Sequence, residues 1–299
     1  MGGCLGCNAA TFAMARATNF FHWYGLESRV VKLDNGATIR CWAPKKTRKN
    51  PPLVLLHAFG LYGLSWIFQV PSFSKSFDLY IPDLVFFGDS TTSSAERSEF
   101  YQAECVVELL EKFGVNKFDV VGTSYGGFVA YRMAHMFPEA VRRVVLSNSA
   151  PNKDPASDRR LVEYCGVRSV ADVLMPSNWR DARTAFELCF YKLPRIMPDF
   201  VFKDYLEAVY KKNTKEKLEL LQGLVLGKAD SPELPTLSQD VLIVWGDHDK
   251  VFDVEYAYKL RKHLGEQAEV AVIKNTAHAP QFERVSEYNK IVVSYLKRP

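Results

Sequence analysis

The stretch that decides the fold is Gly122-Thr123-Ser124-Tyr125-Gly126-Gly127, which lies between an apolar run at 117–121 and a segment with helical periodicity. A G-x-S-x-G sequence between a strand and a helix is typical of a sharp turn that exposes the serine hydroxyl. We expect the chain to pass close to itself in this turn, where Gly122 and Gly126 have no Cβ atoms to collide. The context therefore predicts a strand, a turn that carries Ser124, and a helix.

Outward from this turn, apolar runs alternate with helical patterns along most of the chain. Such alternation favours an α/β fold with a mostly parallel sheet flanked by helices. We expect eight strands, at 28–33, 38–43, 53–57, 77–81, 117–121, 143–147, 240–245 and 269–273. The apolar periodicity of 96–113, 253–264 and 283–297 predicts helices that pack on this sheet.

The alternation stops after Ala150. From 151 to 235 we expect only helices, at 157–165, 168–174, 181–190 and 203–227. This organisation predicts a helical cap at 151–235, inserted into a core formed by 28–150 and 236–299. The cap is rich in aromatic residues, which suit either the lining of an apolar pocket or a small core within the cap. They are Tyr164, Trp179, Phe186, Phe190, Tyr191, Phe200, Phe202 and Tyr205.

The composition is that of an ordinary globular protein, with 299 residues, 47% hydrophobic and 24% charged, so the chain can bury a large core. The net charge of +4 is spread along the sequence, without a basic run beside spaced aromatics, and we expect no nucleic-acid partner. The uncharged stretch 51–74 is interrupted by Gly60, Gly63 and Pro71 and contains the expected strand 53–57. It therefore predicts a buried parallel strand, not a membrane span.

Six cysteines lie far apart except for Cys4 and Cys7, and no secretory signal is visible. This predicts reduced thiols in a cytoplasmic protein. The CxxC spacing of Cys4 and Cys7 lacks a second pair of ligands, so we expect no metal, and no cofactor motif is present.

A serine nucleophile needs a histidine base, and that base needs an acid to hold its tautomer. Where the nucleophile lies on such a turn, the chain order is serine, acid, histidine, each on a loop after a strand. His278 follows the expected strand 269–273 and fits the base. The acid is Asp247 or Asp249, both directly after the strand 240–245, and chemistry alone leaves this choice open.

The loop His57-Ala58-Phe59-Gly60 follows the expected strand 53–57. Attack on a carbonyl develops negative charge on its oxygen, which two preorganised backbone N–H groups stabilise. We expect one from Tyr125 and the other from the loop that holds Phe59. For His57 we expect a hydrogen bond that orients the loop, not the role of base.

These motifs, in this order over residues 28–298, resemble those of the α/β-hydrolases typified by lipases, carboxylesterases and meta-cleavage-product hydrolases, and are similar to plant members of that group. The resemblance implies the amides of Phe59 and Tyr125 as oxyanion donors, with Ala58 in place of the usual glycine. In that family the catalytic acid commonly lies in a Gly-x-x-Asp sequence, which selects Asp249. Haloalkane dehalogenases and epoxide hydrolases of this fold use an aspartate nucleophile, which does not fit Ser124. Carbon–carbon bond hydrolases often have a tryptophan after the catalytic histidine, where this chain has Ala279.

The expected function is therefore cleavage of an ester-type bond in a hydrophobic small molecule through an acyl-enzyme. Two alternatives stay open. One is carbon–carbon bond hydrolysis of the meta-cleavage-product type, and the other is a small-molecule receptor that turns its ligand over slowly, as in some plant proteins resembling this fold. Residues that bind the substrate outside the triad are not identified by the sequence.

The N-terminal segment 1–27 has no acidic residue before Glu27 and carries aromatics between Phe12 and Tyr24. It predicts a helix whose aromatic face either packs on the core or cap or makes peripheral contact with a membrane. The start of the chain resembles a lipidation motif, with Gly2, Cys4 and Cys7 as possible sites, although Gly6 occupies the position where the usual motif has Ser or Thr.

Overall fold

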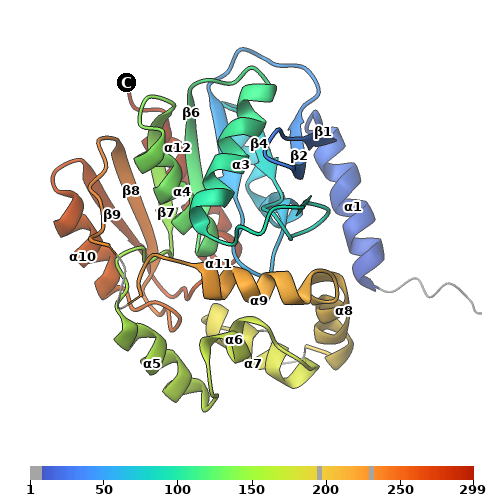
Figure 1. Ribbon diagram of the computed structural model, residues 1–299, viewed down its shortest axis with the longest axis vertical. Coiled ribbons are helices and arrows are strands. Elements are labelled where there is room, and N and C mark those ends of the chain that lie inside the picture. The colour runs from blue at the N-terminus through green and yellow to red at the C-terminus, as the bar shows by residue number, and fades with distance from the viewer. Residues whose placement is uncertain (1–8, 194–196, 229–231) are drawn as a thin grey trace, which may run out of the picture.

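A computed structural model describes residues 9–193, 197–228 and 232–299, and its strands form one twisted sheet (Figure 1). The strand order is β1-β2-β4-β3-β6-β7-β8-β9, with β5 paired to β2. The strands are β1 (Leu26–Lys32), β2 (Ala37–Pro44), β3 (Pro52–Leu56), β4 (Asp78–Pro82), β5 (Thr91–Thr92), β6 (Phe118–Thr123), β7 (Val141–Ser147), β8 (Asp240–Gly246) and β9 (Ala268–Ile273).

The fold is that of an α/β-hydrolase sheet, as predicted, with one correction to the strand count. All eight expected strands are present with ends shifted by a residue or two, but the described residues also contain β5, which makes nine strands. At two residues, β5 is too short to show an alternating pattern. The six strands from β4 to β9 along this order pair in parallel, while β1, β2 and β5 join them through antiparallel pairs.

Helices cover both faces of the sheet, because successive side chains of a buried strand point to opposite faces. In β3, Val54 and Leu56 pack into one core with α3, α4 and α10, while Leu53 and Leu55 pack into the other with α1, α2 and α12. These helices and the shorter elements are α1 (Ala9–Trp23), η1 (Gly63–Phe68), α2 (Val70–Phe73), α3 (Glu99–Lys112), α4 (Tyr125–Met136), α10 (Glu255–Leu264), α11 (Pro280–Glu283) and α12 (Val285–Leu296).

The chain between β7 and β8 contains only helices among its described residues, and these lie together at one end of the sheet (Figure 1). They are α5 (Pro155–Cys165), α6 (Val170–Leu174), α7 (Trp179–Cys189), α8 (Asp199–Tyr210) and α9 (Thr214–Gly223), and we call them the cap helices. The single helix expected at 203–227 is wrong. The chain breaks into α8 and α9 because Asn213 takes a left-handed φ of 54°, which a helix does not tolerate.

Helix α1 packs along the edge of the molecule against β1 and η1, and it also contacts α8 (Figure 1). Phe21 is fully buried with its ring edge against Trp42, and Phe20 and Tyr24 pack on the same core. Trp23 is 86% exposed. Part of the aromatic face therefore packs on the core, and membrane contact stays a prediction. Gly2, Cys4 and Cys7 lie outside the described residues.

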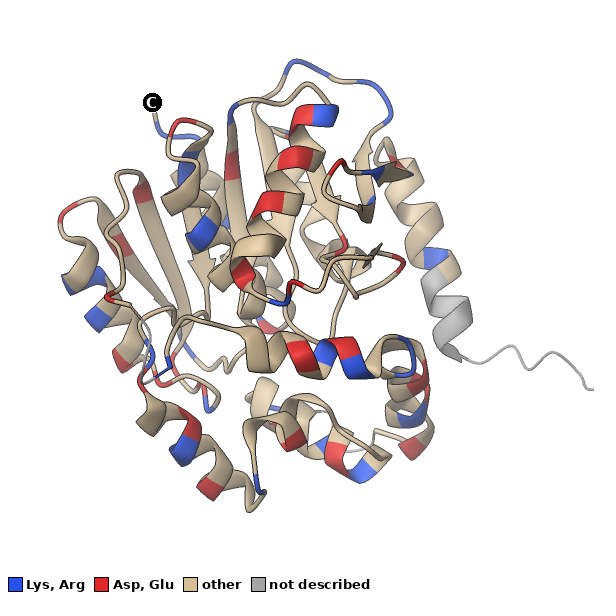
Figure 2. Ribbon diagram, viewed as in Figure 1, with Lys and Arg blue, Asp and Glu red and all other residues tan. Residues whose placement is uncertain are grey.

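Charged residues occur mostly on the outer helices and loops, while the central strands have few of them along most of their length (Figure 2). Among the described residues, the four cysteines Cys41, Cys105, Cys165 and Cys189 are free thiols. No cluster of three metal-binding side chains occurs within the described ranges. In the same ranges, every helix is too short or too polar to cross a membrane.

Candidate active site

The turn at Ser124 is as sharp as the sequence predicts. Ser124 has φ 52° and ψ −118°, and its N–H donates to the carbonyl of Ser147 over 2.9 Å, which fixes the turn to the neighbouring strand β7. A Cβ atom on Gly122 would lie 2.2 Å from the carbonyl oxygen of Gly126, and one on Gly126 would lie 2.4 Å from that of Leu56. The first glycine is thus needed inside the turn, and the second is needed where the turn meets the end of β3.

Three of the predicted site residues meet in a chain of hydrogen bonds. Nε2 of His278 lies 2.9 Å from Oγ of Ser124, and Nδ1 of the same ring lies 2.8 Å from Oδ2 of Asp249. Both Asp249 and His278 are 8% exposed. All three follow strands whose carboxyl ends share one edge of the sheet, since β6, β8 and β9 are parallel. The arrangement lets His278 accept the serine proton while Asp249 holds the ring.

The structure also separates the two acids that residue chemistry left equal and of which the resemblance selected Asp249. Oδ1 of Asp249 accepts the N–H groups of Val251 and Phe252, so its Oδ2 is aimed at His278. Asp247 points elsewhere, because its Oδ1 accepts from the N–H of Thr276 and lies 2.7 Å from Nδ1 of His248. Asp247 thus holds the turn, and of the two aspartates Asp249 is the one bonded to His278.

Asn148 belongs to this site and was missed in the sequence. Its Nδ2 donates to Oδ2 of Asp249 over 2.7 Å and to the carbonyl of Ala277 over 3.2 Å, so it links the acid to the loop that carries His278. Asn148 is fully buried and takes a left-handed φ of 45°. The available signal was its position, directly after β7 at the same edge of the sheet.

The loop after β3 forms a tight turn in which Leu61 N–H donates to the carbonyl of Ala58 over 3.2 Å and Gly60 has φ 72°. The rings of Phe59 and Tyr125 contact each other edge-on, with centroids 5.7 Å apart. Among the described residues, no protein acceptor bonds to the backbone N–H of Phe59 or to that of Tyr125, the first residue of α4. Both amides therefore lack a protein partner among the described residues, as oxyanion donors require.

His57 holds this turn from the core side, as the sequence analysis expected. Its Nδ1 lies 2.9 Å from the carbonyl oxygen of Ala58, and its Nε2 accepts the N–H of Leu84 over 3.0 Å. Burial lowers the pKa of His57 to about 4, so the ring is neutral and Nδ1 carries the proton. In a trans peptide the C=O and N–H point in opposite directions, so this bond to Ala58 also aims the N–H of Phe59.

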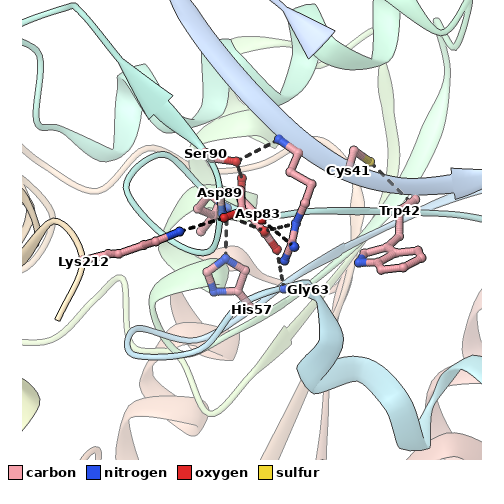
Figure 3. A network of polar contacts seen from close by, with 10 residues as sticks. Cys41, Trp42, His57, Gly63, Asp83, Asp89, Ser90 and Lys212 are labelled. Atoms are coloured by element: carbon pink, nitrogen blue, oxygen red, sulfur yellow. Dashed lines mark hydrogen bonds and ion pairs between the residues drawn. The ribbon is translucent and has the colours of Figure 1, made fainter. Parts of the chain in front are cut away.

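A polar network supports His57 and extends to the cap (Figure 3). Asp83 accepts from the guanidinium of Arg40 at 2.6 Å and from the N–H of Gly63 at 2.7 Å. Arg40 also binds Asp89, whose other oxygen lies 3.0 Å from Nζ of Lys212. Lys212 lies between α8 and α9, so this ion pair fastens the cap helices to the core.

Tyr205 of α8 contacts the same turn directly from the cap side. Its hydroxyl donates to the carbonyl of Gly60 over 3.0 Å. A Cβ atom on Gly60 would lie 2.2 Å from the hydroxyl oxygen of Tyr210, which shows how closely the cap approaches. The turn that carries Phe59 is thus held by His57 below and by Tyr205 above.

Two cavities meet at Ser124. The first, which we call the apolar cavity, has a volume of about 310 Å³. Its wall includes Leu61, Phe186, Phe190, Tyr205, His278 and Phe282. The second cavity has a volume of about 530 Å³. Its wall includes Tyr125, Phe128, Lys153, Asp158, Leu221 and Phe252. The two share Phe59, Ser124, Leu174 and Val251. Both volumes are ordinary for small-molecule sites.

The aromatic residues of the cap divide between the two roles left open by the sequence. Phe186, Phe190 and Tyr205 line the apolar cavity, whereas Phe202 is fully buried and packs on Phe186 within the cap. Tyr164 is 62% exposed and lines neither cavity. Position on the helix decides each role, because only the face towards Ser124 reaches the cavities.

The alpha/beta hydrolase fold family matches residues 51–164 of the chain. The chain is 26% identical to epoxide hydrolase 3 of Xenopus tropicalis, covering 84% of this chain and 72% of that protein. It is also 26% identical to human monoacylglycerol lipase ABHD6, over 92% of this chain and 85% of that protein. Among solved structures, a bacterial membrane phospholipase A superposes with a TM-score of 0.81 at 25% identity, covering 96% of this chain and 91% of that one.

The sheet, the turn at Ser124 and these matches establish that the chain has the alpha/beta hydrolase fold. Its relatives are hydrolases of that fold, with lipases and epoxide hydrolases among them. The residue at the sharp turn after β6 is a serine, which is the nucleophile type of ester hydrolysis.

Proposed function

We propose that the protein is a serine hydrolase that cleaves an ester-type bond of a hydrophobic small molecule through an acyl-enzyme. The observation that carries the proposal is the continuous chain of hydrogen bonds from Asp249 through His278 to Ser124. The two free amides beside Ser124 and the mostly apolar wall of the first cavity support it. The names of its relatives, a monoacylglycerol lipase and a phospholipase A, are consistent with an ester substrate.

The reaction follows from the geometry in two steps. Oγ of Ser124 attacks the ester carbonyl while Nε2 of His278 takes its proton, and the amides of Phe59 and Tyr125 stabilise the oxyanion. The alcohol then leaves with the proton from His278, which forms the acyl-enzyme. Water attacks the acyl group with His278 as base again, and the carboxylic acid and free Ser124 are released.

The proposal is tested with p-nitrophenyl acetate, butyrate and octanoate, using the wild type and Ser124→Ala. We expect turnover and fluorophosphonate labelling in the wild type, and a loss of about 10³-fold or more in kcat together with all labelling in Ser124→Ala. A wild type that neither turns over nor is labelled would contradict the proposal.

Two further measurements separate the alternatives. Carbon–carbon bond hydrolysis is measured with a meta-cleavage product as substrate, and Ala279 after the histidine makes faster ester cleavage the expected result. A slow-turnover receptor would instead give few turnovers per hour and a ligand-dependent rise in melting temperature.

A further inference from the structure

The two cavities are not equivalent with respect to the catalytic groups. His278 lines only the apolar cavity, together with its neighbours Ala279, Gln281 and Phe282. The expected oxyanion donor Tyr125 lines only the second cavity. Ser124 belongs to both, so a substrate bound at Ser124 extends one part into each.

The chemistry of the proposed reaction then decides which part lies where. The leaving oxygen takes its proton from Nε2 of His278, so that oxygen lies on the side of His278 when the bond breaks. The acyl carbon keeps its other substituent, which points away from the leaving group. Since His278 faces the apolar cavity, the leaving alcohol enters that cavity and the acyl group enters the second one.

The walls differ in chemistry as well as in size. Aromatic and aliphatic side chains form most of both walls, but the wall of the second cavity also includes the ion pair of Lys153 and Asp158, whose atoms lie 2.6 Å apart. The side chain of Lys153 is only 8% exposed, so the charged pair forms part of the wall. Burial of apolar surface therefore contributes more to recognition on the alcohol side than on the acyl side.

We propose, building on the ester hydrolysis inferred above, that the substrate is an ester of an apolar alcohol held beside His278 in the apolar cavity. Its larger acyl group occupies the second cavity between Tyr125 and the pair Lys153 and Asp158. Selectivity for apolar groups then resides in the leaving alcohol, and the acyl side tolerates more polar and larger groups.

Two alanines of the cap helices allow a matched test. Ala185 of α7 lines the apolar cavity and Ala171 of α6 lines the second cavity. Of the two cavities at Ser124, Ala185 lines only the apolar cavity and Ala171 only the second, so Ala185→Phe and Ala171→Phe add the same ring to different cavities; Ala185 also borders a separate pocket within the cap. Two substrate series are compared with both variants: acetates of alcohols from ethyl to octyl and benzyl, and ethyl esters of acids from acetate to decanoate.

In the wild type, kcat/KM in the alcohol series rises by up to about fourfold for each added methylene. The rise per methylene in the acid series is smaller. Ala185→Phe lowers kcat/KM of the benzyl and octyl acetates about tenfold or more and leaves ethyl decanoate little changed. It also leaves the deacylation rate of a preformed acyl-enzyme unchanged, because the alcohol has already left. Ala171→Phe has the opposite pattern and slows deacylation of long acyl groups.

The reversed pattern, or equal effects of both variants on both series, would overturn the assignment of the cavities while leaving ester hydrolysis intact. Failure of the wild type to hydrolyse any ester in either series would instead defeat the proposed function. Melting temperature and fluorophosphonate labelling are measured for both variants. If one misfolds, Ala→Leu at the same position takes its place in the comparison.

Discussion

Replacing Tyr205 with phenylalanine removes the hydroxyl through which the cap contacts the turn after β3, which carries Phe59. That hydroxyl donates to the carbonyl of Gly60 over 3.0 Å, and burial raises the pKa of Tyr205 well above 10, so it remains a donor at any assay pH. We expect a lower kcat with a nearly unchanged KM, because the amide of Phe59 acts on the oxyanion of the transition state and not on the bound ester.

The size of the effect follows from one lost hydrogen bond. Such a bond contributes about 0.5 to 1.5 kcal/mol, whereas complete loss of one oxyanion donor costs roughly 10²- to 10³-fold in kcat. The carbonyl of Ala58 keeps its bonds to His57 and to Leu61 N–H, so the turn persists with more freedom. At about 1.4 kcal/mol for each factor of ten, we expect kcat to fall about three- to tenfold.

The assay is single-turnover hydrolysis of a p-nitrophenyl ester, with the affinity for a trifluoromethyl ketone as a second measurement. That inhibitor forms an oxyanion on Ser124, so its affinity is expected to fall by the same factor as kcat. Tyr191→Phe is the matched control, since Tyr191 belongs to the cap sequence but lines neither cavity. A change in KM alone, or equal losses in the two variants, would refute the role of Tyr205.

Three further predictions concern the residues around Ser124. Asp249→Asn should lower kcat on the order of 10³- to 10⁴-fold, whereas Asp247→Asn should keep kcat within an order of magnitude of the wild type. Both are measured in steady-state assays, and similar losses of kcat in the two variants would contradict the assignment of Asp249 as the acid. Gly122→Ala should reduce the free energy of unfolding by about 1 to 3 kcal/mol or more in urea titrations, because its Cβ would lie 2.2 Å from a carbonyl oxygen. Because burial lowers the pKa of His57 to about 4, the unfolded chain binds a proton there before the folded one does, so stability should fall as pH drops from about 6.5 towards 4. His57→Gln should flatten that part of the profile, and an unchanged slope would argue against this cause.

Much of the fold was predictable because local patterns report local structure. The apolar runs predict every strand except the two-residue β5, and the periodicity of 96–113 predicts α3. The break between α8 and α9 was not predictable in this way, because both sides of it have helical patterns and it depends on the left-handed φ of Asn213, the residue before α9. A single backbone angle leaves little trace in the spacing of apolar residues.

The sequence by itself predicted the turn at Ser124, because strand, turn and helix are local, and it predicted the chain order of acid and histidine from the topology. Residue chemistry left Asp247 and Asp249 equal, since both follow β8, and the resemblance to α/β-hydrolases selected Asp249. The physical reason comes from the tertiary structure, in which two N–H groups and Asn148, the residue after β7, orient Asp249 toward His278. The cap contacts on Gly60 and the two cavities likewise depend on side chains distant in sequence, whose meeting no local pattern records.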